Sequence, residues 1–272
     1  MSVLREFEAP FEGTTIHYWR GGGGNPLIFL HGSGAGVGTM SNFRRVLDPL
    51  AREFEIVAAD LIGFGRSGRC LVQPYYDIEM WIRQARFLMD FFPSQKVGLV
   101  GHSLSGSIVL KAAVRNPCVS GVVTTGTTGS RSEAVKDGPR WAFPEGREQI
   151  RQHVERTLFD KSLASEEEIG NRLAVLSSPG YREYFESMFS RDRNYCLNQA
   201  ALTSEELAGI ECPVLLMHGA NDASFKPEET SLLLAKGMPR ADVLVLARCA
   251  HSVALEYPEK FIANARLLWN RE

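Results

Sequence analysis

Three residues far apart in the chain, Ser103, Asp222 and His251, have the types and the order of a nucleophile, an orienting carboxylate and a base. A serine hydroxyl is a poor nucleophile near neutral pH, so it needs a neighbouring base, which in turn needs a carboxylate to hold it. Each residue lies just after a predicted strand, and the carboxyl ends of parallel strands meet at one edge of a sheet. The sequence therefore predicts a Ser-His-Asp triad that attacks a carbonyl carbon.

Ser103 lies in the segment KVGLVGHSLSG, at the junction of an apolar strand and a helix. A nucleophile elbow needs this junction, because its tight turn exposes the hydroxyl at the sheet edge beside the N–H groups of the helix start. Gly101 is one of the small residues that the elbow needs, whereas position 105 is Ser and glycine follows at 106. The alternative is a serine that only caps its own helix, and the two other triad residues favour the nucleophile.

An oxyanion formed by attack on a carbonyl needs two preorganised N–H donors. One is expected from Leu104, which follows the nucleophile. The other is expected from the glycine-rich loop HGSGAG at 31–36, and we assign it to Ser33, with Gly34 as the alternative. A phosphate-binding loop is the competing interpretation, but neither G-x-G-x-x-G nor a Walker lysine fits this segment.

These residues require a sheet that brings the strand ends together. Near-continuous apolar runs are typical of strands covered on both faces of a parallel sheet. Predicted strands lie at 14–19, 26–30, 54–60, 96–100, 120–125, 213–219 and 241–247. Predicted helices lie at 42–53, 78–92, 104–116, 228–236 and 258–269. The pattern predicts an α/β fold with a mostly parallel, doubly wound sheet.

Residues 131–208 interrupt this alternation, since they show no strand pattern and contain many helix formers. Two amphipathic helices are expected there, within 145–159 and 165–178. We therefore predict a helical cap inserted into a core domain that comprises residues 1–130 and 209–272. The active site is expected where this cap meets the sheet edge.

The composition excludes several classes of function. The chain has 30 basic and 32 acidic side chains and no block of like charge, so neither nucleic acid nor a membrane surface is expected as a partner. Five scattered cysteines without a CxxC pair argue against a disulfide framework or a zinc site. The charged start MSVLREFEAP does not fit a signal peptide, so a cytoplasmic location is expected. No cluster has metal-ligand spacing, and we expect neither a metal nor a cofactor.

Most of the chain resembles the α/β-hydrolase family, and more closely the meta-cleavage product hydrolases, which cleave a carbon–carbon bond in vinylogous 1,5-diketones from ring-opening dioxygenases. The similar segments are HGSGAG with Ser41 and Asn42, DLIGFGRSG, GHSLSG, FDKSLASEEEIGNRLAVLSSP, HGANDASF and RCAHSVALEYPEKF. The cap segment at 159–179 is the most informative, because caps differ strongly among α/β-hydrolases. The resemblance implies an α/β-hydrolase fold with an inserted helical cap, and a role in aromatic hydrocarbon catabolism.

The resemblance also implies roles for individual residues. It supports the triad and the oxyanion donors named above, and it places Arg172 of the cap on the substrate carboxylate with Asn42 as a polar partner. A bidentate guanidinium suits a planar 2-oxo or 2-hydroxy acid. The alternative for Arg172 is an exposed helix arginine in a surface ion pair.

Two positions depart from the family pattern. The family usually has Asn before the nucleophile and Trp after the catalytic histidine, where this chain has His102 and Ser252. These changes predict a differently shaped or more open pocket, in which His102 is either a polar substrate contact or a filler beside the elbow. Gly34, Trp141 and Ser252 complete the candidate substrate-binding residues, with cap packing as the alternative for Trp141.

The expected reaction starts from a 2-hydroxy-6-oxo-hexa-2,4-dienoate, which His251 helps to ketonise. Ser103 then attacks C6, and cleavage of the C5–C6 bond gives 2-hydroxypenta-2,4-dienoate and an acyl-enzyme that water hydrolyses. A carboxylesterase or lactonase with the same triad is the first alternative, and a ligand-sensing receptor is the second. The expected partner is a carboxylate-bearing small molecule. Because family members are often dimers or larger, a homo-oligomer is a further expectation.

Overall fold

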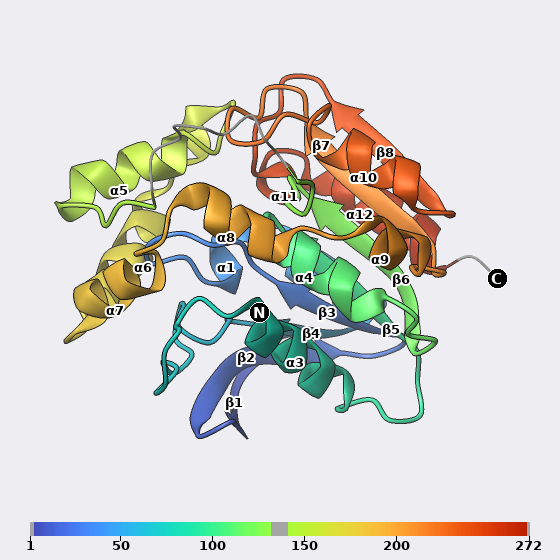
Figure 1. Cartoon of the computed structure of the whole chain (residues 1–272), viewed down its shortest axis with the longest axis horizontal. Coiled ribbons are helices and arrows are strands. Elements are labelled where there is room, and N and C mark those ends of the chain that lie inside the picture. Colours follow the sequence, from blue (N-terminus) through green and yellow to red (C-terminus); the bar gives the residue numbers. More distant parts are fainter. Residues whose placement is uncertain (1–2, 132–140, 271–272) are drawn as a thin grey trace.

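The computed structural model describes residues 3–131 and 141–270, and in them eight strands form one sheet (Figure 1). Their order across the sheet is β1-β2-β4-β3-β5-β6-β7-β8. Pairing is antiparallel between β1 and β2 and between β2 and β4, and parallel from β4 to β8. The strands are β1 (Arg5–Phe11), β2 (Thr14–Gly22), β3 (Pro26–Leu30), β4 (Glu55–Ala59), β5 (Val97–His102), β6 (Val119–Thr125), β7 (Val214–Gly219) and β8 (Ala241–Leu246).

Helices cover both faces of the sheet, which confirms the doubly wound α/β prediction. Ile28 and Leu30 of β3 pack on one face with α3 and α4, whereas Leu27 and Phe29 pack on the other with α12. The core helices are α1 (Thr39–Phe43), α2 (Leu47–Leu50), α3 (Ile78–Met89), α4 (Leu104–Ala113), α10 (Ser231–Gly237), α11 (Val253–Glu256) and α12 (Pro258–Trp269). None of the helices in the described residues is long and apolar enough to cross a membrane.

The described residues between β6 and β7 form helices and no strand. They are α5 (Gly146–Glu155), the 3₁₀ helix η1 (Lys161–Leu163), α6 (Glu166–Leu176), α7 (Tyr181–Met188), α8 (Arg193–Ala200) and α9 (Ser204–Ala208). Helices α5, α6 and α7 lie beside the core helices at one end of the molecule (Figure 1). Residues 132–140 of the predicted cap lie outside the described residues. The boundary between core and cap stays a prediction.

Several elements differ from the sequence prediction, and three of the differences have a clear position in the core. Strand β1 was not predicted, because it is an edge strand with four consecutive exposed residues and little apolar pattern. The helix predicted over 42–53 is two short helices, since Pro49 has no N–H to continue a helix through the preceding turn. Helix α10 begins at Ser231 rather than at position 228.

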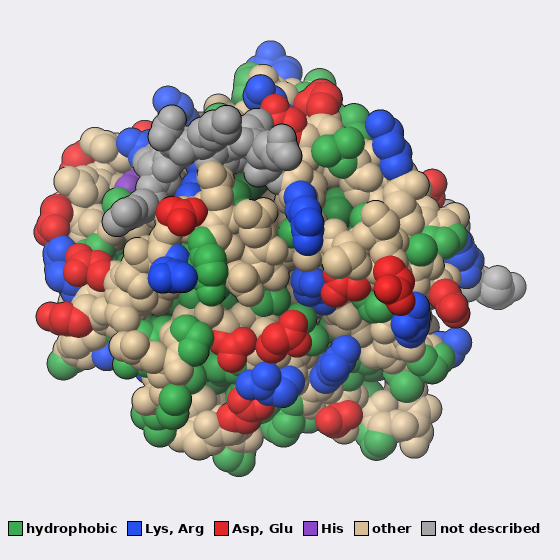
Figure 2. All heavy atoms as spheres, viewed as in Figure 1, with side chains coloured by type: hydrophobic (Ala, Val, Ile, Leu, Met, Phe, Trp, Pro, Cys, Tyr) green, Lys and Arg blue, Asp and Glu red, His purple; other side chains and the backbone are tan. Residues whose placement is uncertain are grey.

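The surface mixes charges of both signs. Figure 2 shows Lys and Arg side chains interspersed with Asp and Glu side chains across one face of the molecule. This distribution agrees with a net charge of −2 and with the lack of long runs of like charge in the sequence.

Candidate active site

Ser103 occupies a sharp turn between β5 and α4. Its φ of 52° and ψ of −116° are unusual for a residue with a side chain, and this strain is expected of a nucleophile elbow. The Ser103 N–H donates to the Thr125 carbonyl at 2.9 Å, and the Ser103 carbonyl accepts from the N–H groups of Gly106 and Thr128. A side chain at Gly101 would collide with the backbone oxygen of Ser105, so the glycine lets α4 approach β5.

Asp222 and His251 form the second part of the predicted triad. His251 Nδ1 lies 2.6 Å from Asp222 Oδ2, and both side chains are buried. Asp222 Oδ1 accepts from the N–H groups of Ser224 and Phe225, which fixes the carboxylate in its loop after β7. Burial opposes ionisation of Asp222, but the charge of His251 and a hydrogen bond from His218 outweigh it and hold the Asp222 pKa well below its usual range.

The structure brings Ser103 and His251 to the same cavity, which has a volume of about 300 Å³. The described residues contain no hydrogen bond between the Ser103 hydroxyl and the His251 ring. Catalytic hydrogen bonds are often long in a free enzyme and tighten when substrate binds. The strand ends therefore place the three residues as predicted, and their catalytic roles stay a prediction.

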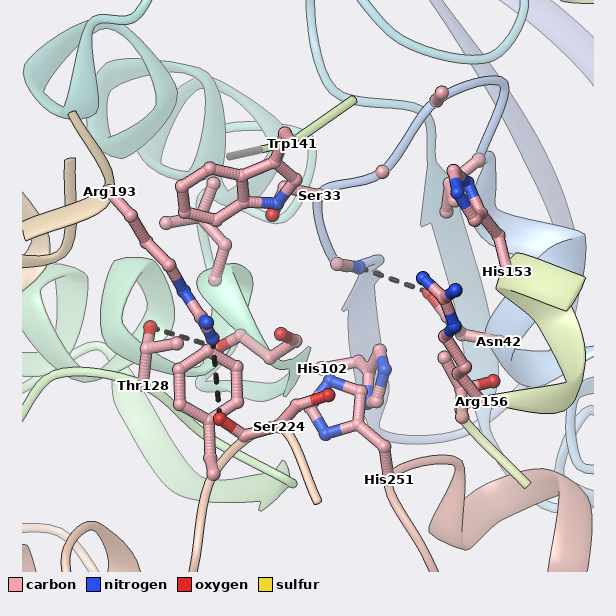
Figure 3. Close-up of a pocket in the computed structure, with 18 of the residues that line it drawn as sticks. Ser33, Asn42, His102, Thr128, Trp141, His153, Arg156, Arg193, Ser224 and His251 are labelled. Carbon is pink, nitrogen blue, oxygen red and sulfur yellow. Dashed lines mark hydrogen bonds between the residues drawn. The ribbon is translucent and has the colours of Figure 1, made fainter. Parts of the chain in front are cut away.

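The glycine-rich loop after β3 forms another wall of this cavity. Ser33, Gly34 and Leu104 all line it, next to the nucleophile. The Gly32 N–H donates to Asn42 Oδ1 at 3.0 Å, as the dashed line in Figure 3 shows. Asn42 thus lines the cavity and also holds the loop that is predicted to supply an oxyanion donor.

Arg172 reaches the cavity from α6 and is buried, unlike the exposed arginine of the alternative interpretation. Its Nε lies 2.5 Å from Glu168 Oε1, one helical turn earlier. Burial opposes ionisation of Glu168, but the charge of Arg172 outweighs it and lowers the Glu168 pKa. Gly36 permits this arrangement, since a side chain there would meet the backbone of Arg172.

The two positions that depart from the family pattern have different surroundings. His102 lines the cavity, and its Nδ1 lies 2.9 Å from Thr125 Oγ1. Ser252 does not line the cavity: its N–H donates to the Thr157 carbonyl at 3.0 Å, and its hydroxyl contacts the Thr157 hydroxyl. Ser252 therefore joins the start of α11 to the segment after α5. Its place next to His251 in the sequence did not reveal this contact.

Several cavity residues were missed by the sequence analysis. His153, Arg156 and Arg193 line the cavity from α5, from the residue after it, and from the start of α8. They belong to none of the motifs that the sequence analysis used, and only the packing of the helices shows that they line this cavity. Trp141 lines the cavity and also stacks on Phe189, with ring centroids 4.8 Å apart. It therefore packs within the cap, and its role in substrate binding stays a prediction.

Comparisons with known proteins agree with this geometry. Residues 25–258 match the α/β-hydrolase fold family. The 2-hydroxy-6-oxo-2,4-heptadienoate hydrolase of Pseudomonas putida is 32% identical over 247 residues, which cover 89% of this chain and 87% of that protein. The 2-hydroxymuconate semialdehyde hydrolase of Pseudomonas sp. strain CF600 is 30% identical, over 95% of this chain and 91% of that protein. The solved meta-cleavage product hydrolase of Pseudomonas fluorescens IP01 has a TM-score of 0.87 and 26% identity, and covers 95% of each chain.

Proposed function

The chain belongs to the α/β-hydrolase family and, within it, to the meta-cleavage product hydrolases, and on this premise we propose that it cleaves the C5–C6 bond of 2-hydroxy-6-oxo-hexa-2,4-dienoates. One observation carries the proposal: the cap residue Arg172 shares a cavity with Ser103 and His251. An ester hydrolase needs only the triad and the oxyanion donors, whereas a dienoate substrate also carries a carboxylate. Arg172 provides the cation that this carboxylate needs.

Binding comes first. The substrate carboxylate pairs with Arg172, whose guanidinium is held by Glu168, and this places C6 beside Ser103. His251 then takes the proton from the 2-hydroxyl group and delivers it to C5. The C5 carbon becomes saturated, so that the later cleavage leaves a stabilised enolate rather than a vinyl anion.

Nucleophilic attack follows. The Ser103 hydroxyl adds to C6 while its proton passes to His251, and Asp222 stabilises the resulting imidazolium through the 2.6 Å contact. The N–H groups of Ser33 and Leu104 stabilise the oxyanion. When the tetrahedral intermediate collapses, the C5–C6 electron pair passes into the enolate, which takes a proton and leaves as 2-hydroxypenta-2,4-dienoate. Water then hydrolyses the acyl-enzyme to a carboxylic acid.

The assay for this proposal uses the purified chain with dienoates that carry hydrogen, methyl or phenyl on C6. The yellow dienolate absorbance should disappear over many turnovers, and chromatography should detect 2-hydroxypenta-2,4-dienoate in equal amount to the acid. If the colour persists while simple aryl esters are turned over, the chain is an esterase, the alternative that His102 favours. Consumption of one equivalent alone would indicate a ligand-sensing receptor.

The location and assembly of the protein complete the proposal. All five cysteines are free, which supports a reducing compartment such as the cytoplasm. A homo-oligomer is proposed on the resemblance to the family alone. The division into a core of residues 1–130 and 209–272 and a cap of residues 131–208 belongs to the same proposal, and it is supported by the helices between β6 and β7.

A further inference from the structure

Arg193, the first residue of α8, points into the active-site cavity and has unusual surroundings for an arginine. Its guanidinium lies 5.9 Å from the centre of the Trp141 ring and 5.4 Å from that of Phe225. Its Nη2 donates to the Ser224 carbonyl at 3.3 Å. Burial among these groups lowers the Arg193 pKa, so the charge is partly removed from water. An anion that binds beside such a partly desolvated cation stabilises it more than it would stabilise an arginine that is fully exposed to water.

Arg193 lies across the cavity from the residues expected to hold the dienoate. Figure 3 shows Arg193 on one side with Thr128 and Ser224, whereas Asn42 and Arg156 lie on the other side. The ring of His251 lies between the two groups (Figure 3). A substrate whose carboxylate is held beside Asn42 therefore extends its C6 substituent past the triad toward Arg193.

The described residues that line the cavity carry charges of one sign. Arg156, Arg172 and Arg193 are present, and no Asp or Glu is among the described residues that line it. Glu168 offsets the charge of Arg172, but no carboxylate in residues 3–131 and 141–270 forms an ion pair with Arg193. Glu229 lines a smaller neighbouring cavity, and it pairs with Lys226 at 3.3 Å. The two ends of the cavity can therefore each hold an anion.

We propose that the preferred substrate is a dianion whose C6 substituent ends in a carboxylate bound by Arg193. This inference rests on the proposed function, which places the dienoate carboxylate at the opposite end. Cleavage adds water across the C5–C6 bond as before. The acyl half then leaves as a dicarboxylic acid, and the other half is still 2-hydroxypenta-2,4-dienoate. The reaction that supplies such a substrate is the ring opening of a catechol whose side chain ends in a carboxylate.

The loop after β7 ties Arg193 to the catalytic residues. The N–H of Ser224 donates to Asp222 Oδ1 at 2.8 Å, while the Ser224 carbonyl accepts from Arg193. Asp222 in turn holds His251. Arg193 is thus anchored to the same loop as the triad carboxylate, so the guanidinium selects a substituent of defined length.

A matched pair of substrates tests the inference. Both are 2-hydroxy-6-oxo-hexa-2,4-dienoates with a C6 substituent of two methylene groups, which ends in a carboxylate in one and in the nearly isosteric carboxamide in the other. Because a charge-assisted hydrogen bond contributes about 1.5–3 kcal/mol, we expect kcat/KM to be about 10- to 100-fold higher for the carboxylate. A carboxamide that is cleaved equally well would overturn the inference.

Variants assign the preference to Arg193. In Arg193→Met the ratio of kcat/KM between carboxylate and carboxamide should fall close to one, and Arg193→Lys should retain part of it. Arg191→Met is the matched control, because Arg191 is exposed, packs on Tyr195 and does not line the cavity. A ratio that survives in Arg193→Met, or falls equally in Arg191→Met, would contradict the assignment.

The outcomes also separate this inference from the proposed function. Turnover of both substrates without preference would leave the carbon–carbon hydrolase intact and remove only the role of Arg193. If neither dienolate loses its colour while aryl esters are hydrolysed, the proposed function itself fails. Circular dichroism and aryl ester turnover of each variant show whether it has folded.

Discussion

The imidazole of His102 lies against that of His251, with ring centroids 4.6 Å apart and planes inclined by 56°. His102 Nδ1 is held by Thr125 Oγ1 at 2.9 Å. Burial, together with the nearby charge of His251, holds the His102 pKa well below its usual range. In the proposed mechanism, a neutral His102 leaves His251 free to accept the Ser103 proton without a second cation beside it.

The burial of His102 leads us to predict how the stability of the protein depends on pH. A histidine whose pKa falls on folding binds more protons when unfolded, so its stabilising contribution is present above the unfolded pKa of about 6.5 and is lost as the pH falls below it. We expect His102→Asn to reduce the loss of stability between about pH 6.5 and pH 5, measured as the urea midpoint across that range. His31, also buried with a lowered pKa, leaves some dependence in the variant. An unchanged slope would contradict a neutral, buried His102.

Asn42 is predicted to act through the oxyanion loop. Asn42→Ala removes the acceptor for the Gly32 N–H, so the loop that carries Ser33 loses its anchor. Loss of a well-placed oxyanion donor costs about 100-fold or more in kcat, and displacement of the loop should cost about 10-fold or more by the same effect. The measurement is kcat and KM on a C6-methyl dienoate. Asn264→Ala, on α12, serves as the control, and a change confined to KM would argue that Asn42 only binds substrate.

Glu168 is predicted to position Arg172. Glu168→Gln keeps a hydrogen-bond acceptor but removes the charge beside Arg172 Nε, so the guanidinium is less well held. We expect KM for dienoates to rise about 10-fold, because one charge-assisted hydrogen bond contributes about this factor to binding. The value of kcat should change far less. Glu167→Gln is the control, because Glu167 is exposed on the same helix. If both variants give the same KM as the parent chain, Glu168 has no positioning role.

Gly101 is predicted to be needed for the close packing of α4 on β5. A side chain at Gly101 would meet the backbone of Ser105, so Gly101→Ala should lower the free energy of unfolding by about 1–3 kcal/mol and reduce kcat by moving Ser103. Gly170→Ala is the matched control, because Gly170 lies in α6 with open space around it and should gain up to about 1 kcal/mol. Urea unfolding of both variants measures whether the free energy of unfolding falls in Gly101→Ala and rises in Gly170→Ala. A stabilised Gly101→Ala would show that the contact relaxes freely.

The sequence predicted the parts of the fold and site that depend on local pattern. The apolar runs located β3 to β8, and the turns after them located Ser103, Asp222 and His251. Strand β1 was missed because its exposed face gives no apolar signal. Ser252 was expected to bind substrate because it follows His251 in the sequence. Its side chain instead contacts Thr157.

The cap was predictable only in part. A resemblance to family motifs identified Arg172, but Arg193 belongs to none of them. Its direction depends on how α8 packs over the loop that contains Phe225, which is a contact between segments more than thirty positions apart. Sequence periodicity gives the buried side of a helix, but it does not show which cavity that side faces. The proposed substrate preference of this chain therefore rests on the structure and not on the sequence pattern.

The most direct test of carbon–carbon hydrolysis by Ser103 is the decay of the dienolate absorbance of 2-hydroxy-6-oxo-6-phenylhexa-2,4-dienoate, compared between the parent chain and Ser103→Ala. We expect multiple turnovers for the parent chain and a loss of about 1,000-fold or more in kcat for the variant, which should still bind the substrate. Cleavage by Ser103→Ala at the parent rate, with release of 2-hydroxypenta-2,4-dienoate, would contradict a nucleophilic role for Ser103.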